Sequence, residues 1–252
     1  MLSMHNQRMF CMQNIFITIT VFALSAFQLV AADLKIVETS SGKPPSDAIV
    51  LFDGHGTEAF LSTCGTPCPW PVVDGAMVTK DEFIVSKLHF RNAQIHVEFA
   101  MPEGCEGKAK IGNSGVYIHG LFELQIINWQ TEDLSPKKTI GSIYNHTPPL
   151  VNAGRRPGQW QTYDILFTAP RHDQNGEIET PGAITAMLNG VLVQYNTPIT
   201  KSVSTWNPLV YRNTPYTDKI RDSIQKTDMG PLFLQYHHSP VKFRNIWIRT
   251  LD

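Results

Sequence analysis

GNSGVYIHGLFELQII, residues 112–127, contains two short runs in which apolar and polar side chains alternate. The even positions of both runs are apolar, whereas the odd positions carry Tyr117, Glu123 and Gln125. Alternation with a period of two is typical of β-strands that bury one face and expose the other to water. The stretch therefore predicts two strands, each with an apolar face and a polar, solvated face.

The link between these two runs decides whether their polar faces coincide. They coincide only if the turn contains an odd number of residues, because each added residue moves the next side chain to the opposite face. A turn over residues 119–121 satisfies this condition, and Gly120 can adopt the left-handed conformation that such turns need. We therefore expect a hairpin with Tyr117 opposite Glu123. Gly112, Ser114 and Gly115 ahead of it permit a close backbone approach or a bulge.

Short β-rich segments recur along the rest of the chain, and Gly, Pro, Asn or Asp bounds each of them. No run of about 10–12 residues has a convincing helical period. A series of many short strands predicts an all-β fold, a jelly-roll sandwich of two antiparallel sheets. The predicted strands lie in residues 48–52, 71–79, 93–102, 160–168, 183–196, 231–238 and 241–251.

The clearest hairpin signal is Asn189-Gly190, a pair that favours a two-residue turn between strands. In an unbroken register this turn sets Leu188 opposite Val191 on one face. The same register sets Ala186 opposite Val193 and Ile184 opposite Tyr195.

Composition limits the class of partner. The 252 residues are 42% hydrophobic, which is enough for one sizeable core, and the formal net charge is only -1. A chain without a basic surplus lacks the electrostatic footprint for nucleic acid or an anionic membrane surface. We therefore expect a neutral partner.

The N-terminal residues resemble an export signal. Arg8 precedes an apolar stretch over residues 15–30, and Ala31 and Ala32 follow it as small residues that a signal peptidase accepts. We expect a signal peptide over residues 1–32, a linker over 33–47 and one domain over 48–252. The mature protein is then periplasmic or extracellular and free of the membrane; a retained transmembrane anchor is the alternative.

Three cysteines remain after removal of the predicted signal peptide. Cys64 and Cys68 flank a Gly-Thr-Pro turn, so they are the favoured disulfide pair in an oxidising compartment, with Cys105 left over.

Five motifs in a fixed order resemble the 3-keto-disaccharide hydrolase family, formerly a domain of unknown function with a concanavalin A-like jelly-roll sandwich. The resemblance covers about residues 48–252. The motifs are GNSGVYIHG, FELQII, GQWQTYDILF, LNGVLVQY and GPLFLQYHHSPVKFRNIWIR.

The resemblance implies cleavage of glycosides whose sugar is oxidised at carbon 3. The ketone acidifies the C2 hydrogen, so a general base can form an enolate that expels the glycosidic oxygen, after which water adds. The product is that of a hydrolase or of a lyase. The alternatives are a non-catalytic, lectin-like carbohydrate-binding module or a scaffold domain on the same sandwich.

Within this resemblance Glu123 is the expected base and His237 the expected acid, base or oxyanion donor. The alternative for Glu123 is a cross-strand ion pair with Arg or Lys on a solvated face. The expected substrate-binding residues are Tyr117, His119, Gln125, Tyr144, Gln235, Lys87 and Arg244.

No cofactor is required by the sequence. A divalent cation held by His119, Glu123 and either His237 or His238 is an alternative means of polarising the ketone. The expected partner is an oxidised disaccharide or glycoside, whose sugar, linkage and anomer the motifs do not specify.

Overall fold

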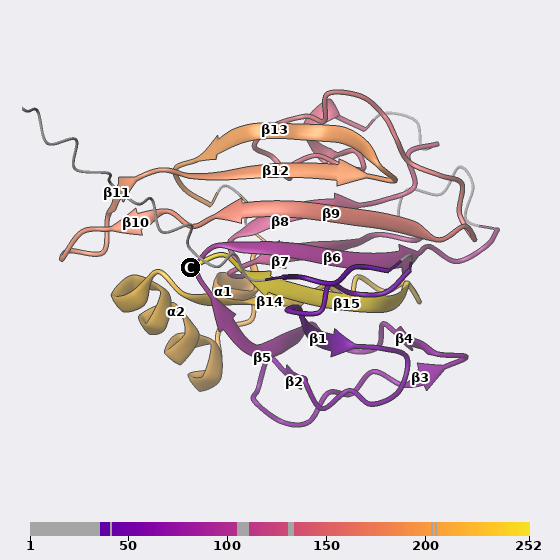
Figure 1. Cartoon of the computed structure of the whole chain (residues 1–252), viewed down its shortest axis with the longest axis horizontal. Helices are drawn as coiled ribbons and strands as arrows, with labels where there is room; N and C mark the ends of the chain where they lie inside the picture. The colour runs from indigo at the N-terminus through magenta and orange to yellow at the C-terminus, as the bar shows by residue number, and fades with distance from the viewer. Residues whose placement is uncertain (1–35, 41, 105–110, 131–133, 203, 205) are drawn as a thin grey trace, which may run out of the picture. The chain divides into compact units, whose positions relative to one another are not determined.

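Two antiparallel sheets form the fold (Figure 1), as the strand pattern predicts. The computed structural model describes residues 36–40, 42–104, 111–130, 134–202, 204 and 206–252. Within them Val37–Asp252 forms one compact unit. The predicted signal peptide and Cys105 lie outside the described residues.

The larger sheet has eight strands among the described residues. Its order is β13-β12-β9-β6-β15-β4-β3, and β1 pairs with β15 beside this path. The central strands β6, β9 and β15 match predicted segments closely. The bounds are β1 Ile49–Phe52, β3 Val72–Val73, β4 Ala76–Val78, β6 Ala93–Ala100, β9 Gln161–Thr168, β12 Gly182–Leu188, β13 Val191–Ile199 and β15 Lys242–Thr250.

The smaller sheet has five strands in the described part of the chain, in the order β2-β5-β14-β7-β8. Its strands are β2 Phe60–Ser62, β5 Ile84–Phe90, β7 Ser114–Ile118, β8 Phe122–Ile126 and β14 Gly230–Leu234. A separate pair, β10 Arg171–His172 and β11 Ile178–Thr180, forms a short hairpin. A single 3-10 turn, η1, covers Pro136–Lys138.

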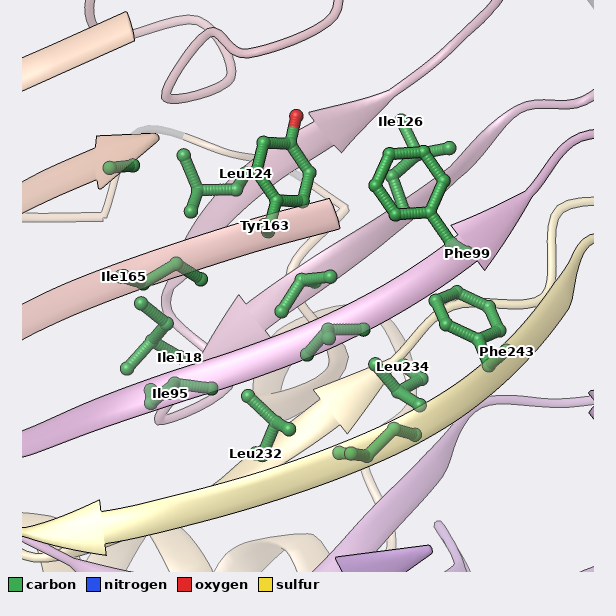
Figure 2. Close-up of a cluster of buried hydrophobic side chains, with 14 of the residues drawn as sticks. Ile95, Phe99, Ile118, Leu124, Ile126, Tyr163, Ile165, Leu232, Leu234 and Phe243 are labelled. Carbon is green, nitrogen blue, oxygen red and sulfur yellow. The ribbon is translucent and has the colours of Figure 1, made fainter. Parts of the chain in front are cut away.

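The main core lies between the two sheets. Figure 2 shows side chains of β6, β9 and β15 meeting those of β7, β8 and β14, among them Phe99, Tyr163 and Leu234. Burial of apolar side chains from both sheets stabilises the sandwich by about 1.5–3 kcal/mol for each large residue. The apolar side chains at the even positions of the opening stretch lie in this core, as the alternation predicts: Val116, Ile118, Phe122, Leu124 and Ile126.

The predicted hairpin over residues 112–127 is confirmed. Its strands, β7 and β8, leave residues 119–121 as the turn, and Tyr117 pairs with Glu123. Both His119 (φ 55°) and Gly120 (φ 67°) take the left-handed conformation, so glycine is not alone in making the turn. The predicted solvated face is wrong: Tyr117, Glu123 and Gln125 are at most 4% exposed.

Two helices cover the Tyr117 part of this face. The described chain places α1, Pro208–Tyr211, and α2, Pro215–Thr227, over the outer face of the five-stranded sheet (Figure 1). Leu209, Ile220 and Ile224 form a second core with Tyr117 and with residues of β5 and β14. The expectation of no helix is therefore wrong.

The local signals for α2 were present but sparse. Thr214 caps the helix by accepting a hydrogen bond from the Thr217 backbone, and Pro215 takes the first helical position. Its buried apolar stripe consists of Ile220 and Ile224 only. Such a narrow stripe in a polar segment gives a weak helical period, although tertiary packing stabilises it.

The register of the Asn189-Gly190 hairpin is only partly as predicted. Leu188 does pair with Val191, but Ala186 pairs with Gln194 and Ile184 with Thr197. Two bulges on β13 each add a residue and displace the later pairs. The pairings of Ala186 with Val193 and of Ile184 with Tyr195 are therefore wrong.

The favoured disulfide is absent from the structure, in which Cys64 and Cys68 are both free thiols. Burial raises the pKa of the Cys68 thiol. No helix in the described ranges is long and apolar enough to span a membrane.

Candidate functional site

Two rows of side chains cross the outer face of the five-stranded sheet. In the first row Phe233 pairs with Tyr117, which pairs with Glu123. In the next row Gly115 lies between its partners, because it pairs with Gln125 and its carbonyl accepts a hydrogen bond from the Gln235 backbone N–H. The rows therefore bring together one carboxylic acid, one phenol and two amides, from β7, β8 and the residue that follows β14.

Gly115 makes room for the carboxyl group of Glu123. A Cβ atom at Gly115 would lie 2.5 Å from Glu123 Oε1 and 2.9 Å from its Cγ. Both distances are too short for any side chain, and Glu123 is too buried to move freely. The space left by the missing side chain of Gly115 is therefore filled by the carboxyl group of Glu123.

A chain of hydrogen bonds holds the group in place. Tyr117 donates its hydroxyl proton to Glu123 Oε2 at 2.7 Å. Gln235 Nε2 in turn donates to the Tyr117 hydroxyl at 3.2 Å. Because each donor is itself buried, the orientation of the Glu123 carboxyl is set by the sheet rather than by solvent.

Burial also changes the acid–base properties of the pair. Desolvation raises the pKa of Glu123 to about 8, and the hydrogen bond from Tyr117 opposes this shift. Desolvation and the nearby Glu123 charge raise the pKa of Tyr117 well above its ordinary value. Tyr117 therefore stays protonated and remains a hydrogen-bond donor throughout the range in which Glu123 titrates.

Glu123 lines a small hollow of about 50 Å³. Four other sequence-predicted residues, Gln125, Tyr144, Gln235 and His237, line the same hollow. Tyr144 is positioned by its backbone N–H, which donates to the Glu123 carbonyl at 2.9 Å. The full lining is Asn113, Glu123, Gln125, Tyr144, Trp206, Gln235 and His237.

The two glutamines each keep one acceptor unused. Gln125 Oε1 and Gln235 Oε1 are buried and have no hydrogen-bond partner among the described residues. A buried acceptor without a partner costs about 1–3 kcal/mol, and a hydroxyl-rich ligand in the hollow would remove that cost. The lining thus suits a sugar, the ligand for which Gln125 and Gln235 are the predicted binding residues.

A larger hollow of about 320 Å³ adjoins the first, because Trp206, Gln235 and His237 line both. Trp206 and Asn113 were missed by sequence reasoning. Asn113 stands in the same GNSG turn as Gly115, but a lone amide in a turn carries no distinguishing signal. Trp206 lies in the polar segment before α1, where only the tertiary fold brings it to the sheet.

His119, a predicted substrate-binding residue, does not reach the site. Its ring is 1% exposed and packs against Phe90 and Phe167, and its Nε2 donates to the Phe90 carbonyl at 2.8 Å. Burial lowers the pKa of His119 to about 3. The left-handed turn directs this side chain into the core, so the prediction of a ligand-binding histidine is wrong.

Arg244 and Lys87 also lie away from the two hollows. Arg244 belongs to the larger sheet, where it forms an ion pair with Glu98 at 2.7 Å and covers the Trp160 ring at 3.9 Å. Lys87 is exposed on β5 and lines neither hollow. Neither residue lies at the candidate site around Glu123, and the Trp160 ring is covered by Arg244.

The suggested cation ligands are not brought together. His119 lies in the core, whereas Glu123 and His237 line the small hollow and His238 lines only the larger one. Among the described residues no group of three His, Cys, Asp or Glu side chains is arranged to hold a metal ion.

Comparison with known proteins places this site in a family. Residues 47–249 match the model of the "3-keto-alpha-glucoside-1,2-lyase-like domain". No curated protein matches the chain. A crystal structure of a "putative glycosyl hydrolase" from Parabacteroides distasonis is 35% identical, with a TM-score of 0.72, and the match covers 83% of this chain and 86% of that one.

Two further structures from the same organism share the fold. One is 19% identical with a TM-score of 0.55, over 82% of this chain and 94% of the other. The second is 21% identical with a TM-score of 0.50, over 76% and 99%. The family model and the 35% identical structure support a carbohydrate-processing enzyme. The chain belongs to the 3-keto-alpha-glucoside-1,2-lyase-like domain family.

Proposed function

We propose that the protein cleaves the glycosidic bond of 3-keto-glycosides by elimination, with Glu123 as the base. One observation carries the proposal: a buried carboxyl group with a pKa of about 8 lines a polar hollow and is held by Tyr117. A general base is most effective when its pKa lies near the working pH. The family description, which refers to an alpha-glucoside, makes a 3-keto-α-glucoside the first substrate to test.

The first step transfers the C2 proton of the sugar to the Glu123 carboxylate. The electrons of the C2–H bond form a C2=C3 double bond, and the negative charge moves to the oxygen on C3. At pH 7 about one tenth of Glu123 is ionised in the free protein, given its pKa of about 8. Desolvation makes this carboxylate a stronger base than an exposed one, which offsets its lower population.

The second step expels the leaving group. The C3 carbonyl re-forms, a C1=C2 double bond appears, and the bond from C1 to the glycosidic oxygen breaks. That oxygen takes a proton, for which His237 and the newly protonated Glu123 are the candidates that line the hollow. The unsaturated 3-keto sugar is the lyase product; addition of water, with hydroxyl to C1 and hydrogen to C2, gives the hydrolase product.

The amides have a positioning role in this scheme. Gln125 and Gln235 each present a buried carbonyl oxygen to the hollow, and sugar hydroxyls are the donors that satisfy them. Tyr144 forms another wall beside the base. Fixing the ring against these groups aligns the C2–H bond with Glu123, which is the contribution that orientation makes to catalysis.

The deciding experiment compares methyl 3-keto-α-glucoside, a 3-keto-disaccharide and both unoxidised parents as substrates, with and without a chelator. NMR follows the unsaturated ketone and the free 3-keto sugar. We expect product only from oxidised sugars. Equal cleavage of the parents contradicts the keto mechanism, and loss of activity with the chelator, restored by a divalent cation, supports the cation alternative.

A matched pair of variants tests the base. Glu123→Gln keeps the shape of the side chain and should bind the 3-keto-glucoside but turn it over at least about 100-fold more slowly. Glu179→Gln changes an exposed glutamate and should match the parent. Turnover by Glu123→Gln at the parental rate excludes Glu123 as the base, and binding without turnover by the parent favours the carbohydrate-binding module.

Export belongs to the proposal as well. Cleavage after Ala32 and release to the periplasm or medium would place the enzyme where oxidised glycosides arrive from outside the cell. Mass spectrometry of the protein recovered from its host identifies the mature N-terminus. A chain that keeps residues 1–32 contradicts this part of the proposal without affecting the chemistry.

A further inference from the structure

The larger hollow differs in chemistry from the hollow that holds Glu123. Its lining includes four aromatic side chains, Phe83, Trp206, Tyr211 and Tyr236, together with Arg212. No Asp or Glu is among its described lining residues. The small hollow instead presents a carboxyl group and amides. Two different parts of one substrate would suit these two environments.

The volumes also favour a substrate that extends from one hollow into the other. The small hollow, at about 50 Å³, is several times smaller than its neighbour of about 320 Å³. It suits the reacting carbon and its substituents rather than a whole glycoside. Because Trp206, Gln235 and His237 line both spaces, the rest of the substrate enters the larger hollow of about 320 Å³.

Trp206 and Tyr211 give the larger hollow a defined shape. Their ring centroids lie 5.0 Å apart and the ring planes meet at 71°, so the two rings form a corner. Each residue is about half exposed, 50% for Trp206 and 52% for Tyr211, which leaves a face available for contact. A flat ring that enters this corner can stack on one aromatic face and meet the other edge-on.

The corner is built on a fixed support. Asn207 caps α1 by accepting a hydrogen bond from the Val210 backbone at 3.0 Å, between the two aromatic residues in sequence. The guanidinium of Arg221 in α2 donates to the Leu209 carbonyl, which ties the two helices together. Aromatic residues on a capped and anchored turn lose little entropy when a ligand binds.

Charge indicates which end of the substrate lies here. In the elimination the electron pair of the broken bond stays on the glycosidic oxygen, so negative charge develops on the leaving group. Arg212, whose guanidinium carbon lies 5.5 Å from the Tyr211 ring centre, supplies positive charge at the same wall. A wall with an arginine and no carboxylate stabilises a departing anion.

We infer that the larger hollow is a leaving-group subsite and that it selects an aromatic leaving group, a phenol, over a small alkyl alcohol. The inference rests on the proposed function for its orientation of the substrate. The phenol departs with the electron pair of the C1–O bond and takes up one proton. Tyr211 and Arg212 are the residues that set this preference.

Binding to Glu123→Gln tests the inference without relying on turnover. Calorimetry compares phenyl 3-keto-α-glucoside with methyl 3-keto-α-glucoside on this variant. We expect the phenyl compound to bind at least about tenfold more tightly. Adding Tyr211→Ala should remove most of that ratio, whereas Tyr211→Phe, which keeps the ring, should preserve it. Val210→Ala, a change at an exposed neighbour on α1, is the matched control.

Turnover by the parent sequence then separates the two proposals. If the parent cleaves both the phenyl and the methyl glycoside and the two bind equally tightly, the subsite proposal is wrong and the proposed elimination stands. A phenyl preference in binding with no cleavage of either compound supports the subsite and overturns the proposed function. A tenfold preference that Tyr211→Ala and Arg212→Gln leave unchanged also contradicts the inference, because the selection then arises elsewhere.

Discussion

The Tyr117 hydroxyl lies 2.7 Å from Glu123 Oε2, and the two residues face each other directly across the β7–β8 hairpin. Both are buried, and the phenol keeps its proton over the range in which the carboxyl group ionises. The pair therefore combines a proton acceptor of raised pKa with a permanent donor that fixes its orientation.

The pH dependence of stability should reveal the titration of Glu123. Its folded pKa, about 8, exceeds the ordinary 4.5, so the unfolded chain releases the proton first and the parent loses stability as pH rises between these values. The loss has an upper bound of about 5 kcal/mol. Glu123→Gln cannot ionise, so its melting temperature should exceed that of the parent increasingly from pH 5 to pH 8.5. A constant difference across this range contradicts the raised pKa.

Tyr117→Phe should impair catalysis more than folding. It removes the donor to Glu123, and because that hydrogen bond lowers the Glu123 pKa, the limb of the profile in which activity rises with pH should move to higher pH. A hydrogen bond to a charged group contributes about 1.5–3 kcal/mol, so kcat/KM should fall about 10- to 150-fold. The pH profile of kcat/KM measures both effects.

Tyr195→Phe is the control for that substitution, since Tyr195 is 72% exposed and lies on the other sheet. It should leave the profile unchanged. A Tyr117→Phe profile with the parental midpoint and rate shows that the phenol does not act on Glu123.

Gly115→Ala should displace the Glu123 carboxyl group. The new Cβ would lie 2.5 Å from Oε1, and a buried side chain has no low-energy alternative position. We expect activity to fall at least about 100-fold and stability by about 1–3 kcal/mol. Gly56→Ala is matched, because its Cβ would also meet a glutamate carboxyl, that of Glu58, but Glu58 is exposed and can move. Equal activity of the two variants would show that activity does not need the space that Gly115 leaves for the Glu123 carboxyl group.

His119 should act on stability rather than on catalysis. Its folded pKa, about 3, lies below the ordinary 6.5, so the unfolded chain binds a proton first and stability falls as pH drops from 6.5 toward 3. In the parent the His119 ring should show no protonation shift between pH 5 and pH 8 by NMR. His119→Gln should lower stability at pH 7 by about 1–3 kcal/mol through lost packing. The stability of this variant should fall less than that of the parent when the pH drops from 6.5 toward 3. A fall in the kcat of the folded variant contradicts this structural role.

Local sequence was informative wherever the relevant physics is local. The alternation of residues 112–127 and the odd turn predict that Tyr117 faces Glu123, and Asn189-Gly190 predicts the pairing of Leu188 with Val191. Period, turn length and turn residues decide these features. The bulges on β13 displaced the later pairs, since bulges depend on contacts outside the hairpin.

Roles that depend on burial were harder to predict. His119 and Arg244 have side chains typical of binding sites, yet one packs in the core and the other pairs with Glu98 on the larger sheet. The residue type shows what a side chain can do, but the neighbours that determine its role come from distant parts of the chain.

By itself the sequence determined most of the strands, the two-sheet sandwich and the facing of Tyr117 and Glu123, because these follow from period and turn geometry within a few residues. Only the tertiary structure decided that this polar face is buried. Helices α1 and α2, remote in sequence, pack on Tyr117, and Tyr144 and Trp206 line the hollow beside Glu123. Burial at this place raises the pKa of Glu123 to about 8. Burial comes from contacts between distant segments, and therefore no local pattern contains it.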